Sequence, residues 1–500
     1  MDKHRRVSGF NSQEHPFLQP FSSFDFIEKH YGGEDSIRRI FSLARSHGAD
    51  KLVVENISPI GILKEVQEDL QSLYPDYTSK GIHRLSFWKI DKLIGYAIVK
   101  HDMAQKSRKA PIDRWHVFES IMPKYEHAHN CVRHTKPVII RVGNTDYNLE
   151  GYLYCQQNSL SYACAHVALR TILSSRKSIV DVSYRDIRKI ACDQSKGKGL
   201  DPDQIGKVLN HFGVKYQAID YGEASKTDKA IRNAHPYNQL VYSGVESGGG
   251  ALIGFKLGSR KRFHIIPAFG HTFNKDTWIV DAEQRYFQIK TDLEYIPSER
   301  WTSSLLAHDD NVGPNYCIPR LYIENKSVSY VAEIFREGIQ YSGTEAEVIA
   351  INWLDSIFEY FDNNEIWQFR ILSQTRRKSI ILRAVALSKQ EYIQHLQSMK
   401  DWKGNIEDFN FVKTIEKYVP EYLWMVEIST TQLFPANERK LGEIILDGSV
   451  SFQDKNPLAT YCFARIPSRF IVPVSIVKGG RKQIQIFKSL LISHTELWKG

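Results

Sequence analysis

The sequence predicts an α+β fold, in which a central domain of helices followed by an antiparallel sheet is flanked by two mixed α/β domains. A length of 500 residues gives a prior of about three domains. Hydrophobic residues make up 42% of the chain and aromatic residues 12%, which is ample for packed cores. In the central region helical periods come first and strand-like runs follow, an order typical of α+β units. We expect domains at residues 1–145, 146–300 and 301–500.

The first domain, residues 1–145, mixes helices and strands. Residues 34–49 carry apolar side chains at helical spacing and end near Gly48, which predicts a helix. The stretch SPIGILKEVQEDLQSLYP has a Ser-Pro start and a helical period closed by a proline, so it predicts another. Strands are expected at KLVVENI, IHRLSFWKI and LIGYAIVK, which are rich in branched and aromatic residues. No role is assigned to this domain.

The central domain, residues 146–300, has its first helix where Cys164 stands. Two more helices are expected, at VSYRDIRKIACDQ and at DPDQIGKVLNHFG, which has an Asp cap and a first-turn proline. Strands are expected at VKYQAI, QLVYSGV, GALIGFKL, RFHIIPAFG and TWIVDAE. Gly248, Gly249 and Gly250 precede a strand-like run rather than a helix, so they favour a loop or hairpin turn over a phosphate cradle.

The last domain, residues 301–500, is again mixed. TEAEVIAINWLDSIFEYF predicts a long amphipathic helix, and EIWQFRILS, SIILRAVALS and LWMVEIST predict strands. Short helices are expected at SKQEYIQHLQSM and NERKLGEIIL. This domain contains no motif that carries chemistry, and its role is left open.

Composition excludes several classes of protein. The six cysteines are too few for a disulfide framework and contain no close pair of the zinc-ribbon kind; they are Cys131, Cys155, Cys164, Cys192, Cys317 and Cys462. The N-terminal stretch lacks the apolar core of a signal peptide, and no run reaches the ~18 apolar residues of a membrane span. The net charge of +9 is mild and its basic residues are scattered, so nucleic acid is not indicated. We expect a cytoplasmic protein of bacterial origin.

The candidate nucleophile is Cys164, which stands where the polar stretch QQNSLSY gives way to the helical AHVALRTIL. A free thiol has a pKa of ~8.5, and the positive end of a helix favours its anion. The position therefore suits an activated cysteine, although a buried structural thiol would fit the same pattern. Neighbouring His166 is a poor base, because a residue two positions further on points away round the helix.

A better base is His264, early in the strand-like RFHIIPAFG. If a hairpin turn is centred between Thr272 and Phe273, His264 faces Asp281 on the next strand. Directly opposite side chains lie ~5 Å apart, close enough for a carboxylate to orient an imidazole. His271 is the weaker alternative, because pairing it with Asp281 would shorten both strands.

When a thiolate attacks a carbonyl group, the carbonyl oxygen becomes an oxyanion, which hydrogen-bond donors must stabilise. A glutamine amide upstream of the cysteine can act as one donor, together with the Cys164 backbone N–H. Gln157 lies seven residues before Cys164, and Gln156 lies eight before it. We prefer Gln157. The predicted catalytic set is therefore Cys164, His264, Asp281 and Gln157.

The order of Gln, Cys on a helix, His on a strand and Asp on the next strand resembles that of papain-like cysteine peptidases. More narrowly, QNSLSYACAHVAL and HIIPAFG…VDAE resemble the branch that cleaves double-glycine leader peptides from bacteriocin precursors. GLDPDQIGKVLNHFGVKYQAI resembles that branch's middle helix, glycine and strand. Ala163, Ala165 and Ala282 depart from its pattern, where Asp, Gly and Pro are usual. The resemblance covers the central region only and implies a papain-like domain there.

The resulting expectation is a thiol hydrolase that cleaves a peptide or isopeptide bond through an acyl-enzyme on Cys164. Acyl transfer or deamidation uses the same chemistry, and a non-catalytic peptide-binding module is the alternative from another class. A peptide or protein substrate is the expected partner; no cofactor and no metal are expected, and the oligomeric state is open. Four residues close together in the sequence are of the types that bind zinc, but no second group of ligands accompanies them: His127, His129, Cys131 and His134.

Overall fold

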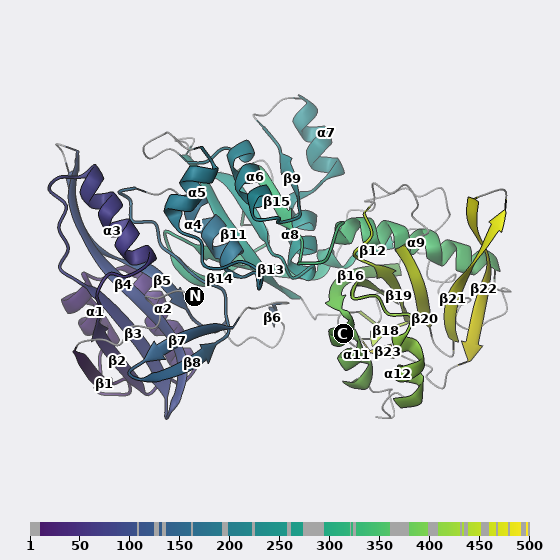
Figure 1. Cartoon of the computed structure of the whole chain (residues 1–500), viewed down its shortest axis with the longest axis horizontal. Coiled ribbons are helices and arrows are strands. Elements are labelled where there is room, and N and C mark those ends of the chain that lie inside the picture. Colours follow the sequence, from purple (N-terminus) through teal and green to yellow (C-terminus); the bar gives the residue numbers. More distant parts are fainter. Residues whose placement is uncertain are drawn as a thin grey trace.

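The computed structural model places three large β-sheets side by side, each with its own helices, and the described residues add two small two-stranded sheets (Figure 1). It describes most of the chain between residues 11 and 498. The described ranges are 11–107, 110–124, 130–132, 137–161, 164–192, 199–222, 226–257, 262–273, 295–320, 322–323, 327–360, 380–398, 409–430, 433–434, 439–451, 460–466, 469–478, 481–491 and 497–498. Helices and antiparallel sheets mix throughout, as the predicted α+β class requires.

The N-terminal sheet is an antiparallel meander. Its strands follow chain order: β1 (Ser12–Pro16), β2 (Lys51–Asn56), β3 (Ile82–Lys89), β4 (Lys92–Ser107) and β5 (Ala110–Ile121). Helices α1 (Ser23–Tyr31) and α2 (Asp35–Ser46) pack on one face of the sheet, and α3 (Ile62–Leu73) packs on the other. The predicted helices and strands of this region are confirmed. A separate small ladder joins β7 (Val138–Val142) to β8 (Thr145–Leu149).

The α3 face of the N-terminal sheet shares one hydrophobic core with the central helices. Leu63 and Val66 of α3 belong to the same buried cluster as Leu169 and Ile172 of α4 (Cys164–Ser174). That cluster also includes α5 (Tyr184–Ile190) and α6 (Pro202–His211). Asp201 caps α6 with a reciprocal capping box and Pro202 occupies its first turn, which is the predicted start of this helix.

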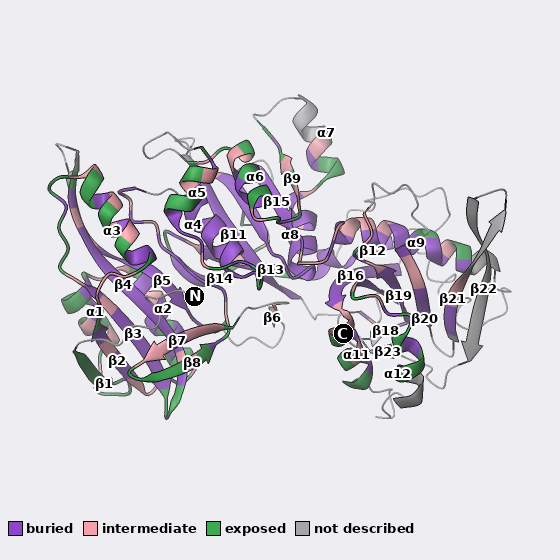
Figure 2. Cartoon of the chain, in the orientation of Figure 1, coloured by how far each residue is buried: buried purple, intermediate pink, exposed green. Residues whose placement is uncertain are grey.

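The central sheet is antiparallel throughout, as predicted. Its strand order is β14-β13-β11-β10-β15-β9, and β6 pairs with β11. The bounds are β6 (Asn130–Cys131), β9 (Tyr216–Asp220), β10 (Ala251–Leu257), β11 (Arg262–Phe273), β13 (Thr302–Asp309), β14 (Gly313–Pro319) and β15 (Val328–Ile334). Figure 2 colours β10 and β11 largely as buried. The sheet runs past residue 300, where the sequence placed a domain boundary, because β13, β14 and β15 complete it.

Two local predictions for the central domain are wrong. Residues 239–245 form part of helix α8 (Tyr237–Glu246) rather than a strand. The described residues of α8 are buried on every side, so its sequence lacks the apolar stripe that reveals a surface helix. Thr272 and Phe273 do not form a hairpin turn, because β11 continues through them. Helix α7 (Lys226–Ala234) precedes α8.

The C-terminal sheet has helices on both faces. Its order is β12-β16-β17-β19-β20-β21-β22, with bounds β12 (Tyr295–Pro297), β16 (Ile380–Ser388), β17 (Tyr422–Thr430), β19 (Gly442–Asp447), β20 (Tyr461–Ile466), β21 (Arg469–Lys478) and β22 (Arg481–Leu491). Helix α9 (Gly343–Tyr360) packs on one face; α11 (Lys389–Ser398) and α12 (Phe409–Glu416) pack on the other. No helix in the described ranges combines the length and apolarity needed to cross a membrane.

The predicted helix at residues 437–446 is also wrong. This segment forms β18 (Arg439–Lys440), which pairs with β23 (Leu497–Trp498), and then β19. Its charges resemble a solvated helix face, but Lys440 and Glu443 are buried and paired with each other at 2.6 Å. Buried ion pairs of this kind cannot be recognised from spacing alone. The predicted strand at residues 365–373 lies outside the described residues.

Candidate active site

Cys164 is the first residue of α4, which confirms its predicted position at a helix N-terminus. The ten residues that follow it in the helix are all buried, whereas Cys164 itself is partly exposed. A core helix therefore holds the thiol rigidly while leaving it accessible. The sulfur therefore stands at the helix end whose backbone N–H groups carry partial positive charge.

His264 lies against Cys164 from the neighbouring strand β11. Helix α4 packs on β11, and the His264 side chain hydrogen-bonds to Cys164. Burial by itself would lower the pKa of His264, but hydrogen bonds to Asp309 and Cys164 and the nearby charge of Asp310 raise this pKa to about 10. The ring is therefore an imidazolium near neutral pH, the state that pairs with a thiolate.

Two adjacent carboxylates hold the other side of the ring. His264 Nε2 lies 3.2 Å from Asp309 Oδ1 and 3.5 Å from Asp310 Oδ1. Asp309 ends β13, the strand that pairs with β11. Burial raises the Asp309 pKa, but the hydrogen bond and charge of His264 outweigh it, and the pKa is lowered overall. Burial and the Asp309 charge raise the pKa of Asp310 to about 7, against the opposing effect of His264.

The sequence assigned the orienting role to Asp281, which lies outside the described residues. Its predicted place opposite His264 depended on a turn at Thr272 and Phe273, and those residues belong to β11. Within the described ranges, Asp309 occupies the expected relationship: a carboxylate on the strand next to the one that carries the histidine. The missed signal was AHDDNVG, in which Asp-Asp-Asn and a glycine two positions later mark a turn at the end of a strand-like run.

Asn311 connects this group to Gln157. Its amide Nδ2 lies 3.3 Å from His264 Nε2, and its Oδ1 accepts a 3.0 Å hydrogen bond from Gln157 Nε2. The Asn311 backbone N–H also donates to Asp309 Oδ1 at 2.9 Å. Gln157, the predicted oxyanion donor, is therefore hydrogen-bonded to a residue that lies against His264.

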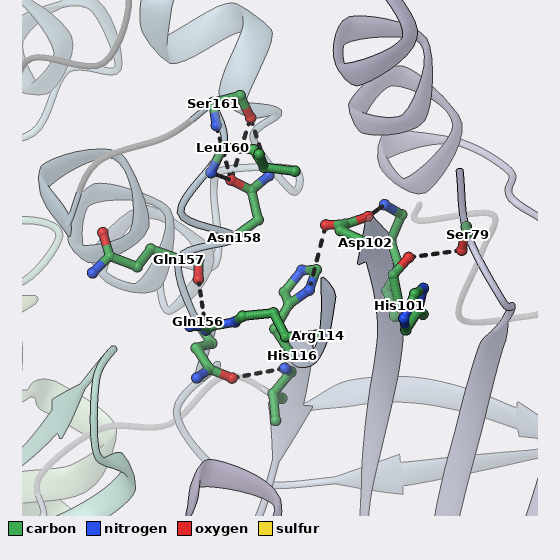
Figure 3. Close-up of polar contacts among 12 residues, drawn as sticks. Ser79, His101, Asp102, Arg114, His116, Gln156, Gln157, Asn158, Leu160 and Ser161 are labelled. Carbon is green, nitrogen blue, oxygen red and sulfur yellow. Dashed lines mark hydrogen bonds and ion pairs between the residues drawn. The ribbon is translucent and has the colours of Figure 1, made fainter. Parts of the chain in front are cut away.

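Gln156 is turned to the N-terminal sheet instead. Its Oε1 accepts a 2.9 Å hydrogen bond from the Val117 backbone N–H, and its own backbone N–H donates to Val117 at the same distance. Figure 3 shows this contact and the Gln157 carbonyl facing Arg114, with the Gln157 amide pointing away from Arg114. These contacts hold Gln156 against β5, whereas the Gln157 amide bonds to Asn311 beside His264.

The loop between Gln157 and the helix is stiffened by Asn158. Its Oδ1 accepts hydrogen bonds from the backbone N–H groups of Leu160 and Ser161 at 2.9 and 3.0 Å (Figure 3). Ser159 has a φ of 61°, in the left-handed region. An Asx-type turn therefore fixes the loop that leads to the nucleophile. Residues 162 and 163, directly before Cys164, lie outside the described ranges.

Cys164 and His264 stand in the wall of a cavity of about 540 Å³. The start of α6 forms one side with Asp201 and Pro202, and Gly254 and Lys256 of β10 form another. The remaining lining residues are Ala165, Gly199, Leu200, Ile205, Asp220, Gly222, Phe263, Ile265, Ser329 and Tyr330. Phe263 is 61% exposed at this cavity, an unusual position for a large apolar side chain in water. The volume and mainly apolar wall suit a short peptide segment.

The other histidine candidates lie elsewhere. His166 is buried within α4. His271 is buried near the other end of β11, where its Nε2 lies 2.7 Å from Glu246 Oε1, so it serves a different cluster. His127, His129 and His134 of the predicted metal-ligand cluster lie outside the described residues, whereas Cys131 is described and contacts His271.

In each of two described groups, three side chains have possible metal-ligand atoms within 4.8 Å of one another. One group is His264 with Asp309 and Asp310, and the other is Cys131 with Glu246 and His271. In the first group His264 also contacts Cys164, and both side chains line the same cavity. The first group therefore fits a thiol–imidazole site better than a metal site.

Comparisons with known proteins give a weak structural likeness. No protein-family model matches the chain, and no curated protein matches it. Among solved structures, the peptidase domain of Streptococcus ComA, a bifunctional ABC transporter involved in a quorum-sensing pathway, is similar. The match covers 37% of this chain and 98% of that one, with 12% identity and a TM-score of 0.23. A likeness at that score carries no functional argument, so function has to be argued from the residues of the site.

Proposed function

We propose that this chain is a papain-like thiol hydrolase that cleaves a peptide or isopeptide bond through an acyl-enzyme on Cys164. One observation carries the proposal: a partly exposed cysteine at a helix N-terminus contacts a histidine that Asp309 holds from the next strand. A nucleophile, a base and an orienting carboxylate in that relationship are the parts that thiol acyl transfer needs.

In the proposed reaction the Cys164 thiolate attacks the substrate carbonyl carbon, and the carbonyl oxygen becomes an oxyanion. The Cys164 backbone N–H and the Gln157 amide stabilise that charge. Because an amide NH₂ has two N–H groups, Gln157 can keep its bond to Asn311 and still donate to the oxyanion. The His264 imidazolium then gives its proton to the leaving amine, which breaks the C–N bond and leaves a thioester.

Water hydrolyses the thioester in the second half of the reaction. Neutral His264 takes a proton from the attacking water, and the Cys164 thiolate leaves as the acid product forms. Asp309 keeps the ring oriented and stabilises its positive charge in both halves. The cavity beside Cys164 would hold the substrate segment, with exposed Phe263 as an apolar contact.

The proposal is tested with full-length protein and a peptide library of diverse sequence. Mass spectrometry of new termini should show cleavages with the native chain and none with Cys164→Ala. Cys192→Ala, which removes an exposed cysteine outside the cavity, is the matched control and should leave the cleavages unchanged. Cleavages that persist in Cys164→Ala would contradict the proposal.

Adding a primary amine separates hydrolysis from acyl transfer. Hydrolysis gives free carboxyl termini whether or not the amine is present, whereas an acyl transferase joins the amine to the acyl product. A Cys164 that reacts neither with substrate nor with a peptidyl electrophile would instead identify a non-catalytic binding module.

A further inference from the structure

Helix α2 contacts the turn that carries the carboxylates of the proposed active site. This turn joins β13, which ends at Asp309, to β14. Arg39 Nη2 donates a 2.7 Å hydrogen bond to the Asn315 carbonyl, and Arg39 Nε donates to the Pro314 carbonyl at 3.3 Å. The same guanidinium lies over the Tyr316 ring, 4.9 Å from its centroid. One side chain of α2 therefore contacts three successive residues of β14.

The helix also packs closely on the start of β14. Gly313 has a φ of 137°, in the region that favours glycine. A Cβ added to this residue would lie 3.0 Å from Arg39 Cβ and 3.5 Å from Ser36 Cα. The first of these distances is shorter than the optimum of about 3.5 Å for two carbon atoms. A larger residue at this position would therefore push the turn away from α2.

Asn315 fixes the same strand to the end of the N-terminal sheet. This residue is buried, and its Nδ2 donates hydrogen bonds to the carbonyls of Met122 and Pro123, directly after β5, at 3.2 and 2.9 Å. Its backbone N–H donates to His308 Nδ1 at 3.1 Å, and His308 Nε2 lies 3.2 Å from the Tyr152 carbonyl oxygen. The β13–β14 turn is therefore held by the N-terminal sheet as well as by α2.

The segment that leads to Gln157 is held by the same helix. The Tyr154 hydroxyl pairs with Ser36 Oγ of α2 at 2.9 Å, and both side chains are buried. The Tyr154 backbone also exchanges two hydrogen bonds with Ser120 of β5, at 2.8 and 2.9 Å. Helix α2 therefore contacts both chain segments that lead to the polar groups of the proposed active site.

We propose that the N-terminal sheet and its helices position the active site, and that Arg39 does so by holding the β13–β14 turn in place. Through this turn, Arg39 sets the distances of Asp309 and Asn311 from His264. Arg39 bonds to the backbone of β14 and not to the imidazole, so it is a positioning residue and takes no part in the chemistry. The inference rests on the proposed function, because these distances matter for turnover only if His264 serves Cys164.

The position of the turn matters because the contacts with the imidazole are directional. Asp309 Oδ1 and Asn311 Nδ2 lie 3.2 and 3.3 Å from His264 Nε2, near the upper limit of hydrogen-bond length. Val312, at the tip of the turn, is 39% exposed, so the turn has to be fixed by the strands on either side of it. A misplacement of about 1 Å in a catalytic group can lower a rate by up to about a hundredfold.

The test compares Arg39→Ala with Arg38→Ala in full-length protein, using a peptide identified in the library. Arg38 is the neighbouring residue on α2 and pairs with Glu28 on the surface, so it is the matched control. Arg39→Ala should lower kcat by about tenfold and change KM by less than about twofold, because it disturbs the catalytic groups rather than the substrate cavity. Arg38→Ala should leave both constants unchanged. A folded Arg39→Ala variant with native kcat would overturn the proposal.

A double-mutant cycle separates positioning from a contribution to stability alone. If Arg39 acts through Asp309, Arg39→Ala should lower kcat by less than about twofold when Asp309→Asn is already present, because both substitutions then remove the same contact. Thermal unfolding checks that the variants are folded. A second loss as large as the first would show that Arg39 acts independently of Asp309, and would contradict the proposal.

Hydrogen exchange at the turn gives a measurement that needs no substrate. The backbone N–H groups of Asn311 and Val312 bond to Asp309, so their exchange reports on the turn. Exchange measured by mass spectrometry should be faster there in Arg39→Ala than in native protein or Arg38→Ala. Unchanged exchange in Arg39→Ala would overturn this inference even if the protein cleaves no peptide, whereas a lack of cleavage by native protein contradicts only the proposed function.

Arg39→Lys is the variant to use if Arg39→Ala does not fold. Lysine keeps the positive charge, but its single nitrogen lacks the rigid fork that reaches the Pro314 and Asn315 carbonyls together. This variant should show a smaller fall in kcat and a smaller rise in exchange at the turn. Native kcat and native exchange in folded Arg39→Lys would contradict the proposal.

Discussion

His264 Nε2 lies 3.2 Å from Asp309 Oδ1, and these two residues are 45 positions apart in the chain. The contact joins β11 to β13, neighbouring strands of the central sheet. On its other side the same ring contacts Cys164 at the start of α4. A helix N-terminus and two strands therefore meet at one imidazole.

Cys164, the thiol of the proposed active site, should react faster than buried cysteines elsewhere in the chain. Iodoacetamide near pH 6 should label it faster than Cys155 and Cys462, because burial raises the pKa of Cys155 to about 11 and that of Cys462 to about 12. His264→Ala should slow labelling of Cys164, since the imidazolium no longer stabilises the thiolate. Peptide mass spectrometry measures each rate. Labelling of Cys164 that does not depend on His264 would contradict the pairing.

Asp309→Asn should lower turnover by about 10²- to 10⁴-fold while the protein stays folded, because the imidazolium loses its orienting charge. Asp281→Asn is the matched comparison and should change kcat by less than about threefold, the size of effect expected of a residue outside the orienting role. Steady-state kinetics on a peptide identified in the library measures both. If only Asp281→Asn reduces turnover, the sequence assignment was right and Asp309 has another role.

Gln157→Ala should lower kcat by about a hundredfold and change KM little, because an oxyanion donor acts on charge that appears only in the transition state. Gln156→Ala should instead affect stability, since it removes the side-chain hydrogen bond to Val117 of β5. Kinetics and thermal unfolding on both variants separate the two effects. A fall in kcat with Gln156→Ala alone would move the donor by one residue.

Asp310 should make the protein less stable as the pH rises from about 4 to about 7. Burial and the Asp309 charge raise its folded pKa from 3.8 to about 7, so in this window the folded state holds a proton that the unfolded state has lost. Stability then falls with rising pH, by at most about 4 kcal/mol over the window. Asp310→Asn removes this contribution. Denaturant unfolding at pH 5 and pH 8 should show a smaller loss in the variant, and an identical loss would contradict the assignment.

The sequence by itself determined the local parts of this site. The change from a polar stretch to a helical period placed Cys164 at a helix start, and a strand-like apolar run placed His264 on a strand. The Asp cap and first-turn proline predicted the start of α6, which lines the cavity. These features depend on residues within a few positions of one another, so a short stretch of sequence is enough to predict them.

Only the tertiary structure decided which distant residues complete the site. Asp309 and Asn311 reach His264 because β13 pairs with β11, and that pairing depends on the whole sheet rather than on a short turn. Helix α8 was not predicted because it is buried on all its described sides. Strands β18 and β19 were not predicted because their charged residues are paired inside the protein. Strand pairing and burial are long-range properties: the free energy that selects them comes from contacts between segments far apart in the sequence.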